Sequence, residues 1–493
     1  MTHTPPAPSF ARAVGRNTII QFAGKVAGTA LGLVTSVLIL HYLHPAGNGS
    51  YSTAMAYLGF FSVVADLGLY LILIRDLSRP GADRQRIVGN LLALRWLSAA
   101  LLLGAGAAVV AWLPLSPAEK TAVFIGTGSY IAVAATQLLV GVFQTNLAMR
   151  YVTGAELAGR VLLLGITWWV IRQHAGLNGI MIAVVGGSLL NFGLVWLFVR
   201  RFVQVRLRFD WAYWRSTLRT TVPIAMSIVL NLIYFRADTI ILRAIKGTYD
   251  VGLYAAAYKI LEILNTFPLM FVGLLLPVLG AAFANQDHPT FQRIFQRGFD
   301  FLIMAALPLL VGGALLAKPL MIFMGGADFA PAAPVFRWLL VAVSALYLGS
   351  LSGHVVTIIN RQRQMVWSYL AVAVMGLIIY LTLIPRWSLY GAATGTIATE
   401  VTTAVVGYIM IMRTMHFRLS VSILPRLLLA AGLMSAAIWW LEKWHWWVAL
   451  VVGALVYVVC LLITRTLSWT VIKDIVSPSA RPDSRLSVEE PAP

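Results

Sequence analysis

Fourteen long apolar segments dominate the hydrophobic pattern of the chain. A transmembrane helix needs about 20 largely apolar residues to cross a hydrocarbon core of about 30 Å. By that measure the sequence predicts spans near residues 17–40, 51–74, 87–113, 120–147, 153–172, 178–200, 218–243, 251–283, 298–317, 335–359, 366–385, 389–412, 424–441 and 446–464. The pattern therefore indicates an all-α integral membrane protein of about 14 transmembrane helices.

Two local features modify this pattern. The segment 251–283 is longer than one span requires and contains Pro268 and Pro277, so we expect a kink or break there. At the chain ends, residues 1–11 and 466–493 hold little apolar surface, and the second is rich in Pro, Ser and acidic residues beyond Ser477. Segments of that kind cannot bury enough apolar surface to fold. We predict disordered tails at both ends.

Composition agrees with a chain whose solvent is lipid. Of its 493 residues, 59% are hydrophobic and 11% are charged, with a mean hydropathy of +0.82, whereas soluble proteins carry about 25% charged residues. Cys460 is the single cysteine, so one chain can form no disulfide and no cysteine-based metal cluster. The sequence indicates no catalytic residue set, no metal site and no cofactor.

The formal charge of +19 acts first as a topology signal. Of the 37 Lys and Arg residues, 24 fall on one side of the predicted spans, 8 fall on the other and five lie inside spans. Cytoplasmic loops carry the excess of basic residues, so we expect both termini in the cytoplasm, and the basic side also attracts anionic membrane lipids. Nucleic acid is not an expected partner.

An internal repeat appears at an offset of 203 residues. The segment from Gly49 to Ala54 aligns with the segment from Gly252 to Ala257, in both cases after an outside loop and at the start of an even-numbered span. This offset corresponds to one block of six helices, and transporters are often built from two such repeats. We predict an N-lobe over 12–200, an amphipathic linker over 201–219, a C-lobe over 220–412 and two further helices over 413–465.

Short motifs in this order and spacing carry a resemblance to a known family. They are Gly15-Arg16-Asn17, the stretches 43–51 and 66–69, Val222-Pro223-Ile224, the stretches 236–242 and 251–259, and a weaker stretch at 324–333. The sequence resembles the polysaccharide-transport branch of the multidrug and oligosaccharidyl-lipid exporter superfamily, and the likeness extends to about residue 465. His41 and His44 stand where the family's first loop usually carries Arg, which leaves the subgroup open.

The resemblance implies a function. It implies a flippase that moves an undecaprenyl-diphosphate-linked oligosaccharide across the bacterial inner membrane by alternating access, for O-antigen, exopolysaccharide or capsule synthesis. The energy for transport is then expected from an H⁺ or Na⁺ gradient, from a partner such as a polysaccharide polymerase, or from removal of product on the far side. The chain contains no Walker A pattern, in agreement with transport that does not hydrolyse ATP.

Ionisable residues inside spans are costly and are candidate site residues by default. Glu156 and Arg160 are four residues apart and Lys259 and Glu262 are three apart, so each pair can meet on one helix face. Each pair is interpreted either as structural neutralisation or as part of a substrate or ion site. Lys259 could instead serve Asp238, which would release Glu262 as an ion acceptor.

Three other charges have no opposite charge at helical spacing on their own span. Lys25, Asp66 and Arg95 lie at a similar depth on the first three spans. We expect Asp66 to neutralise one of the two cations and the other to meet an anion such as a diphosphate. The alternative is a buried structural network that ties the three helices together.

In the second lobe, Arg236 and Lys259 are predicted cavity cations nearer the outside. Asp238, two residues from Arg236, points to another helix face and needs a different partner. Glu400, midway along the span 389–412, is a candidate for ion coupling. The two groups of cations form a step across the membrane along which a diphosphate could be passed.

Two rival functions stay open at this stage. A multidrug exporter of the same superfamily would share the fold. A membrane glycosyltransferase or polymerase would need acid and base groups on a sizeable outside loop. The longest such loop, about 318–334, holds only Lys318 and Asp328 as ionisable groups, so a non-catalytic transporter is favoured.

Overall fold

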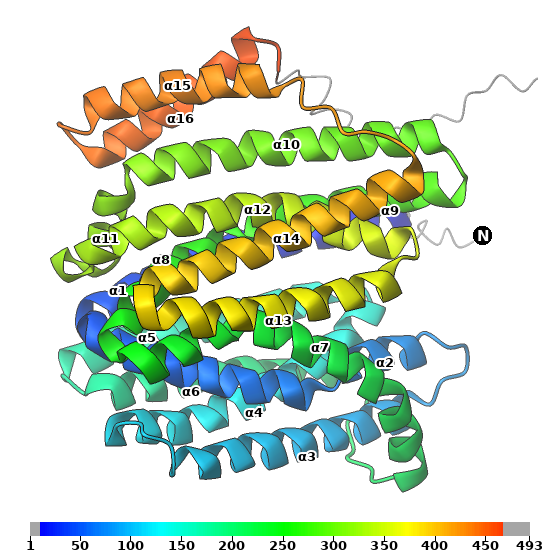
Figure 1. The fold of residues 1–493 in the computed structure, drawn as a ribbon. Coiled ribbons are helices and arrows are strands. Elements are labelled where there is room, and N and C mark those ends of the chain that lie inside the picture. The colour runs from blue at the N-terminus through cyan, green and yellow to red at the C-terminus, as the bar shows by residue number, and fades with distance from the viewer. Residues whose placement is uncertain (1–9, 467–493) are drawn as a thin grey trace, which may run out of the picture. The chain divides into compact units, whose positions relative to one another are not determined.

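The computed structural model describes residues 10–466, and within this range the side chains of 10–19 and 222–236 lie outside the description. Sixteen α-helices and one short 3-10 helix account for nearly all of this part of the chain, which contains no strand (Figure 1). The all-α prediction is confirmed. The predicted tails fall almost wholly on residues 1–9 and 467–493, outside the described residues.

The helices follow one another with short connections. Their bounds are α1 Phe10–Asp66, α2 Leu69–Leu77, α3 Arg84–Val110, α4 Pro117–Thr145, α5 Met149–Arg172, α6 Gly176–Val199, α7 Trp211–Lys246, α8 Thr248–Leu264, α9 Thr266–Ala284, α10 His288–Leu315, α11 Ala317–Gly325, η1 Ala327–Ala332, α12 Ala333–Ile358, α13 Gln362–Trp387, α14 Leu389–Met415, α15 Leu424–Leu441 and α16 Trp446–Ile463.

Twelve helical segments of the described chain are long and apolar enough to cross a membrane. One of them, Ile20–Leu77, has 58 residues and accommodates two predicted spans. The predicted span 218–243 falls in α7, many of whose side chains are outside the description. The structure is thus that of a multi-pass membrane protein, in rough agreement with the predicted fourteen helices.

The first predicted loop is a sharp kink inside α1. His44 has φ 53° and ψ 177°, which is not helical, and Pro45 follows it without a backbone donor. A second break occurs where Leu67 and Gly68 adopt φ 52° and 69° before α2 begins. Positive φ is strained for leucine and easy for glycine. The kink at His44 separates two predicted spans that the hydrogen-bond pattern otherwise joins, whereas the break at Leu67 and Gly68 lies inside the predicted span 51–74.

The predicted linker 201–219 consists of two parts. Residues 203–210 have no regular structure, whereas Trp211 already begins α7 and continues without interruption into the predicted seventh span. Asp210 caps α7 by accepting from the backbone N–H of Tyr213 at 3.1 Å, and Arg86 donates to it at 2.6 Å. The Tyr213 N–H and the Arg86 guanidinium hold the pKa of Asp210 below its ordinary value.

The predicted break in the long eighth segment is confirmed. Helix α8 ends at Leu264 and α9 starts at Thr266, with Asn265 between them and Pro268 in the first turn of α9. Proline is tolerated near a helix N-terminus because its missing N–H would lack an intrahelical partner there. Pro277 lies inside α9 without ending it.

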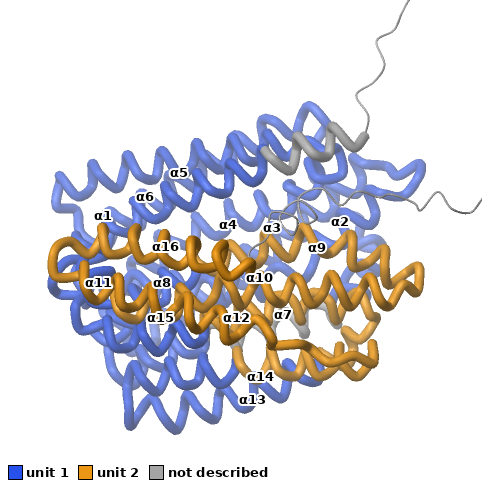
Figure 2. The backbone as a smooth tube through the Cα atoms, turned by 90° about the horizontal axis from the view of Figure 1, so that it is seen from above, with its two compact units in different colours: residues 1–263, 317–342, 366–399 blue, residues 264–316, 343–365, 400–493 orange. Residues whose placement is uncertain are grey.

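Two compact units make up the chain (Figure 2). Unit 1 comprises Met1–Ile263, Ala317–Ala342 and Val366–Thr399, and unit 2 comprises Leu264–Leu316, Val343–Met365 and Glu400–Pro493. This division by packing differs from the predicted lobes. Parts of α7, α8, α11 and η1 pack with α1 and α4 inside unit 1, so segments of both predicted lobes share one unit.

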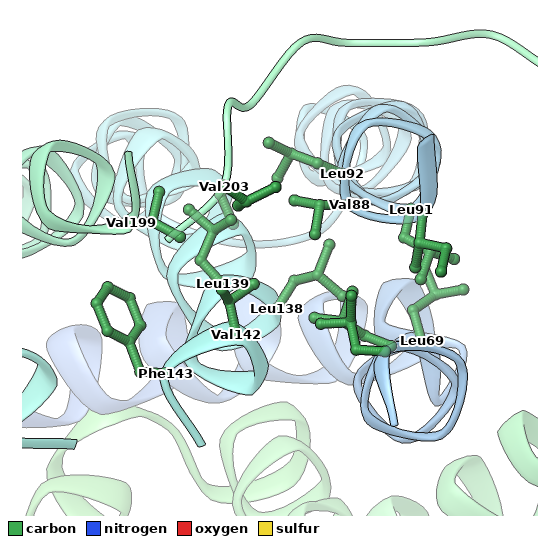
Figure 3. Packing of buried hydrophobic residues seen from close by; sticks show 14 of the residues in the cluster. Leu69, Val88, Leu91, Leu92, Leu138, Leu139, Val142, Phe143, Val199 and Val203 are labelled. Carbon is green, nitrogen blue, oxygen red and sulfur yellow. The ribbon is translucent and has the colours of Figure 1, made fainter. Parts of the chain in front are cut away.

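Unit 1 is held together by close apolar packing between α2, α3, α4 and α6. Leu69, Val88, Leu139, Phe143 and Val199 belong to one fully buried cluster (Figure 3). Lipid is as apolar as leucine, so contact between membrane helices depends on tight packing and on small residues rather than on exclusion of water. The chain uses this device elsewhere in unit 1: a Cβ on Gly159 of α5 would lie 2.7 Å from the carbonyl oxygen of Gly187 of α6.

Unit 2 follows the same rule. Gly453 of α16 lies against Ile438 of α15, where an added Cβ would approach to 2.6 Å. Tyr457 of α16 donates a hydrogen bond to the carbonyl oxygen of Met304 in α10 at 2.9 Å. The two last helices therefore pack onto α10 within this unit.

Candidate functional site

A cavity of about 210 Å³ lies within unit 1, and several polar side chains line it. Helix α1 supplies most of its wall from both sides of the kink, and α4, α7 and α8 complete it. Its lining residues are Ser36, Ile39, Leu40, Asn48, Tyr51, Ser52, Met55, Ala56, Gly59, Tyr130, Thr239, Ala255, Tyr258, Lys259 and Glu262. A concave site of apolar walls with a few convergent polar groups is the usual form of a ligand site.

The cavity contains one ion pair. Lys259 Nζ lies 3.1 Å from Glu262 Oε2, three residues along α8, and the two side chains are 42% and 32% exposed. The predicted pairing of these residues is confirmed. Lys259 forms its ion pair with Glu262 rather than the alternative one with Asp238. Because both groups are partly exposed, their attraction is screened and contributes at most about 1 kcal/mol to stability. The ammonium group remains accessible to an anion.

Neutral hydrogen-bonding groups surround this pair. Tyr130 donates to the carbonyl oxygen of Met55 at 2.9 Å, and Asn48 donates to the carbonyl oxygen of Gly252 at 2.9 Å. Tyr51 and Tyr258 add aromatic faces to the wall. The cavity can therefore offer a cation, a carboxylate, hydroxyl groups and aromatic surfaces to a polar ligand.

Directly behind Thr239 lies a buried polar network. Asp238, which is 2% exposed, accepts hydrogen bonds from Tyr254 at 2.7 Å and from the backbone of Thr239 at 2.6 Å. Tyr254 also contacts Thr396 of α14 at 3.0 Å, and Tyr380 of α13 approaches the same hydroxyl at 3.4 Å. A buried carboxylate in such a network can exchange a proton or a cation.

The structure places Asp66 and Arg95 together, away from the cavity. Arg95 Nη1 lies 2.8 Å from Asp66 Oδ1, which confirms that Asp66 neutralises one of the two cations. Arg95 is 0% exposed and also donates to the carbonyl oxygen of Ala134 and to Gln137. The expectation that Arg95 presents charge to a cavity is corrected: depth along a span does not determine which way a side chain faces, and this one faces protein.

Lys25 and Arg160 lie on neighbouring helices and do not line the cavity either. Arg160 pairs with Glu156 at 2.9 Å, as predicted, and donates to the carbonyl oxygen of Gly28 in α1 at 3.0 Å. Lys25 is exposed on α1 and forms no ion pair within the described part of the chain. A contribution of either residue to substrate binding stays a prediction.

Arg236 and Glu400 are the remaining predicted site residues. Arg236 belongs to α7, but its side chain is outside the described residues. Glu400 is 7% exposed and is the first residue of the last segment of unit 2. Of the predicted site residues, the structure thus brings Lys259 and Glu262 to the cavity and Asp238 to the network beside it.

Sequence reasoning missed a bidentate ion pair near one end of α4. Arg243 of α7 donates to Glu119 of α4 through Nε at 2.8 Å and through Nη2 at 2.7 Å, and the Glu119 side chain is 0% exposed. Glu119 also accepts from the backbone N–H of Ser116 in a capping box. The Ser116-x-x-Glu119 spacing predicts the capping box. No local sequence pattern predicts that Arg243 is the partner of Glu119.

A second missed contact joins the kink of α1 to η1. His44 Nδ1 lies 2.9 Å from Asp328 Oδ2, and both side chains are exposed. On the same side, Ser388 and Asp250 form a hydrogen bond. The contact of His44 with Asp328, like that of Asn48 with Gly252, joins residues of the predicted N-lobe and C-lobe within unit 1.

Residues 14–283, more than half of the chain, match the sequence model of the family described as "Polysaccharide biosynthesis protein". The chain belongs to this family. No protein of curated function matches it in sequence.

The fold of this family member resembles solved structures of transporters. A structure described as "Lipid II flippase MurJ, inward closed conformation" is similar with a TM-score of 0.71 at 14% identity, over 91% of this chain and 99% of that one. An inward-facing MATE-family multidrug resistance transporter of the MOP superfamily is similar with a TM-score of 0.64 at 14% identity, over 80% and 98%. A MOP superfamily transporter from Pyrococcus furiosus gives a TM-score of 0.58 at 15% identity, over 82% and 95%. These likenesses show the fold.

Proposed function

We propose that the protein is a flippase that moves a lipid-linked oligosaccharide from the cytoplasmic to the outer leaflet of the bacterial inner membrane, with undecaprenyl diphosphate as the lipid carrier. The observation that carries the proposal is membership of the polysaccharide biosynthesis family in a chain with a polar, cation-bearing cavity among membrane helices. Both termini lie in the cytoplasm in this proposal, since the basic residues dominate that side.

The chemistry of the cavity suits such a substrate. A diphosphate carries negative charge that the Lys259 ammonium group can meet, and Asn48, Ser52 and the tyrosine hydroxyls can exchange hydrogen bonds with sugar hydroxyl groups. The cavity of about 210 Å³ holds a part of the head group only. The head group therefore needs a conformation in which the cavity widens, as alternating access supplies.

No chemical step is assigned to the protein. The substrate enters and leaves with its bonds intact, so residues are required to bind and to move rather than to transfer protons to a reacting atom. Energy is supplied by an H⁺ or Na⁺ gradient or by removal of product on the far side, for instance by a polymerase. Asp238 in its hydrogen-bonded network is the carboxylate proposed to bind the coupling ion, and Glu400 is the second candidate.

One transport assay tests this function. Purified protein is reconstituted in liposomes with a fluorescent undecaprenyl-diphosphate-linked oligosaccharide, and exposure of the glycan to an impermeant glycosidase is followed over time. Protein-dependent translocation of this lipid, and no translocation of the same lipid in empty liposomes, is the expected result. A protein that leaves the lipid in place would contradict the proposal.

The alternative is a cation-coupled multidrug exporter, favoured by the likeness to MATE transporters. It predicts uptake of cationic drugs driven by an ion gradient in the same liposomes, with no movement of the lipid-linked glycan. A panel that contains both substrates decides between the two functions.

A further inference from the structure

A second pocket, of about 530 Å³, lies wholly within unit 2 and is separate from the transport cavity. Helix α14 forms one wall, and the turn between α12 and α13 forms another. The lining residues are Arg361, Gln364, Val406, Ile409, Met410, Arg413, Thr414 and His416. Three of these eight residues are apolar and five are basic or polar, and no acidic residue of the described chain belongs to the lining.

Two similar helix ends bring the basic residues together. Helix α12 ends at Ile358, and Asn360 with φ 56° turns the chain so that the N–H of Arg361 reaches the carbonyl oxygen of Val356 at 3.0 Å. Helix α14 ends at Met415, and His416 with φ 52° lets the N–H of Phe417 reach Met412 at 3.3 Å. Both are the left-handed turns that commonly terminate helices. Each places an arginine at the pocket.

These two arginines differ from the arginines of the described chain that form ion pairs inside the spans. Within the described residues, the guanidinium groups of Arg361 and Arg413 have neither an ion-pair partner nor a hydrogen-bond partner, and both side chains are exposed. Arg95, Arg160 and Arg243 are all neutralised by carboxylates. A basic residue near a helix C-terminus is favoured by the helix dipole. The dipole accounts for one charge at each helix end but not for the apolar residues beside them.

The apolar residues of the pocket continue from Arg413 along one face of α14. Val406, Ile409, Met410 and Arg413 follow the spacing of a single helix face, and they extend over about 10 Å at 1.5 Å per residue. Ile409 is 40% exposed. The opposite face of α14, with Gly407 and Ile411, is buried in unit 2. A partly exposed apolar strip with two guanidinium groups at its end matches an amphiphile with an anionic head.

We propose that this pocket binds an anionic phospholipid of the membrane, with its phosphate between Arg361 and Arg413 and one acyl chain along Val406, Ile409 and Met410. Guanidinium groups bind phosphate oxygens in a planar, bidentate manner. Gln364 and Thr414 supply further hydrogen-bonding groups beside the phosphate. The proposal does not depend on which substrate the protein transports.

The test measures lipid binding by the purified full chain. Phosphatidylglycerol is titrated into the protein in mild detergent, and the bound lipid is counted by native mass spectrometry. The double variant Arg361→Gln, Arg413→Gln is compared with Arg418→Gln, Arg426→Gln, which removes two exposed charges of unit 2 outside the pocket. We expect the first variant to lower the apparent affinity at one site by roughly tenfold or more and the second to leave it unchanged, since each basic residue at a membrane surface contributes on the order of 1 kcal/mol.

Two further measurements distinguish a lipid phosphate from a free phosphate and test whether the apolar strip contributes to binding. Glycerol 3-phosphate is added as a competitor, and Ile409→Gln is tested as a variant that keeps both charges. Weakened phosphatidylglycerol binding by Ile409→Gln, and no displacement by glycerol 3-phosphate at matched concentration, support a lipid site. If glycerol 3-phosphate displaces phosphatidylglycerol at matched concentration, the pocket binds a free phosphate group and the proposed lipid site is wrong.

Two other results would contradict the proposal altogether. Equal losses in the two double variants would mean attraction by net charge alone, and no loss in either would mean that the pocket is not a binding site. If the Arg361, Arg413 double variant is not recovered folded, as judged by a monodisperse elution profile, Ile409→Gln carries the decision by itself.

Discussion

Gly49 and Gly252, which correspond in the internal repeat, pack backbone against backbone in unit 1. A Cβ atom on Gly49 would lie 1.8 Å from the carbonyl oxygen of Thr248, and one on Gly252 would lie 1.7 Å from that of Pro45. The side chain of Asn48 donates to Gly252 across the same contact at 2.9 Å. The two equivalent motifs of the repeat thus meet each other, with glycine required on both sides of the contact.

Replacement of Gly252 by alanine should open this contact. Cβ–O distances below 3.0 Å cannot exist, so α1 and α8 must separate locally, at a cost of about 1–3 kcal/mol or more. In the liposome assay we expect slower transport. A cysteine at the buried position Thr53 should become more reactive to an impermeant maleimide.

The matched control for this substitution is Gly104→Ala. An added Cβ there meets nothing within 4 Å, so transport and labelling should equal those of the unchanged protein. If Gly252→Ala behaves like Gly104→Ala, the tight contact is not formed in the membrane.

Features that depend on local sequence were predictable. The apolar segments, the break before Pro268 and the pairs Glu156 with Arg160 and Lys259 with Glu262 follow from composition and helical spacing, and the structure agrees. That Asp66 neutralises one of the two cations at similar depth was predicted, and the structure identifies Arg95 as that cation.

The direction in which a helix faces was not predictable from one sequence. In a helix that is apolar on all faces, the sequence does not show which face packs against protein. The depth of Arg95 along its span could therefore be predicted, but its burial could not. The contacts of Glu119 with Arg243 and of His44 with Asp328 join residues more than 120 positions apart, and no spacing rule links them. The cavity likewise arises from helices that only tertiary packing brings together.

The bidentate pair of Glu119 and Arg243 should behave as a unit. Arg243→Gln leaves the fully buried Glu119 carboxylate without its cation, and loss of one partner of a buried pair costs about 3–5 kcal/mol. Glu119→Gln keeps the capping box, because glutamine can serve that motif as well. We expect a clear fall in the unfolding temperature for Arg243→Gln and recovery of much of it in the Glu119→Gln, Arg243→Gln double variant.

Thermal unfolding in detergent measures this coupling as a double-mutant cycle. Additive losses of the two single substitutions would show that the two side chains do not interact. The exposed Arg215 of α7 provides a control, since Arg215→Gln removes a charge from the same helix and should leave the unfolding temperature nearly unchanged.

Arg95 should act on stability rather than on substrate. Arg95→Met removes a fully buried cation and leaves the Asp66 carboxylate without its partner. We expect this to lower the free energy of unfolding by roughly 3 kcal/mol. The addition of Asp66→Asn should restore most of the unfolding temperature and, with it, transport. Restored stability without restored transport would instead return Arg95 to the substrate pathway.

The orientation of the chain can be read from two exposed positions. In a variant without the buried Cys460, a cysteine at Ala327 should react with an impermeant reagent in intact cells, and one at Gln362 should react only after the membrane is opened. This follows from the excess of basic residues on the side of Gln362. The opposite pattern of labelling would reverse the topology.

Lys259 is the cation that the cavity offers to a substrate, and its removal should affect transport far more than stability. Its ion pair with Glu262 is partly exposed, so Lys259→Ala should change the free energy of unfolding by at most about 1 kcal/mol. If the ammonium group meets the diphosphate, initial transport rates in the liposome assay should fall by roughly tenfold or more, since a charge-assisted hydrogen bond contributes about 1.5–3 kcal/mol.

The companion variants separate this role from a purely structural ion pair. Lys259→Arg keeps the positive charge and should retain part of the transport rate. The double variant Lys259→Ala, Glu262→Gln removes the leftover carboxylate, so it should restore transport only if the loss came from leaving Glu262 without its partner. A double variant that remains as slow as Lys259→Ala alone supports contact with the anionic substrate, whereas full recovery assigns Lys259 to the ion pair and leaves the substrate to other groups of the cavity.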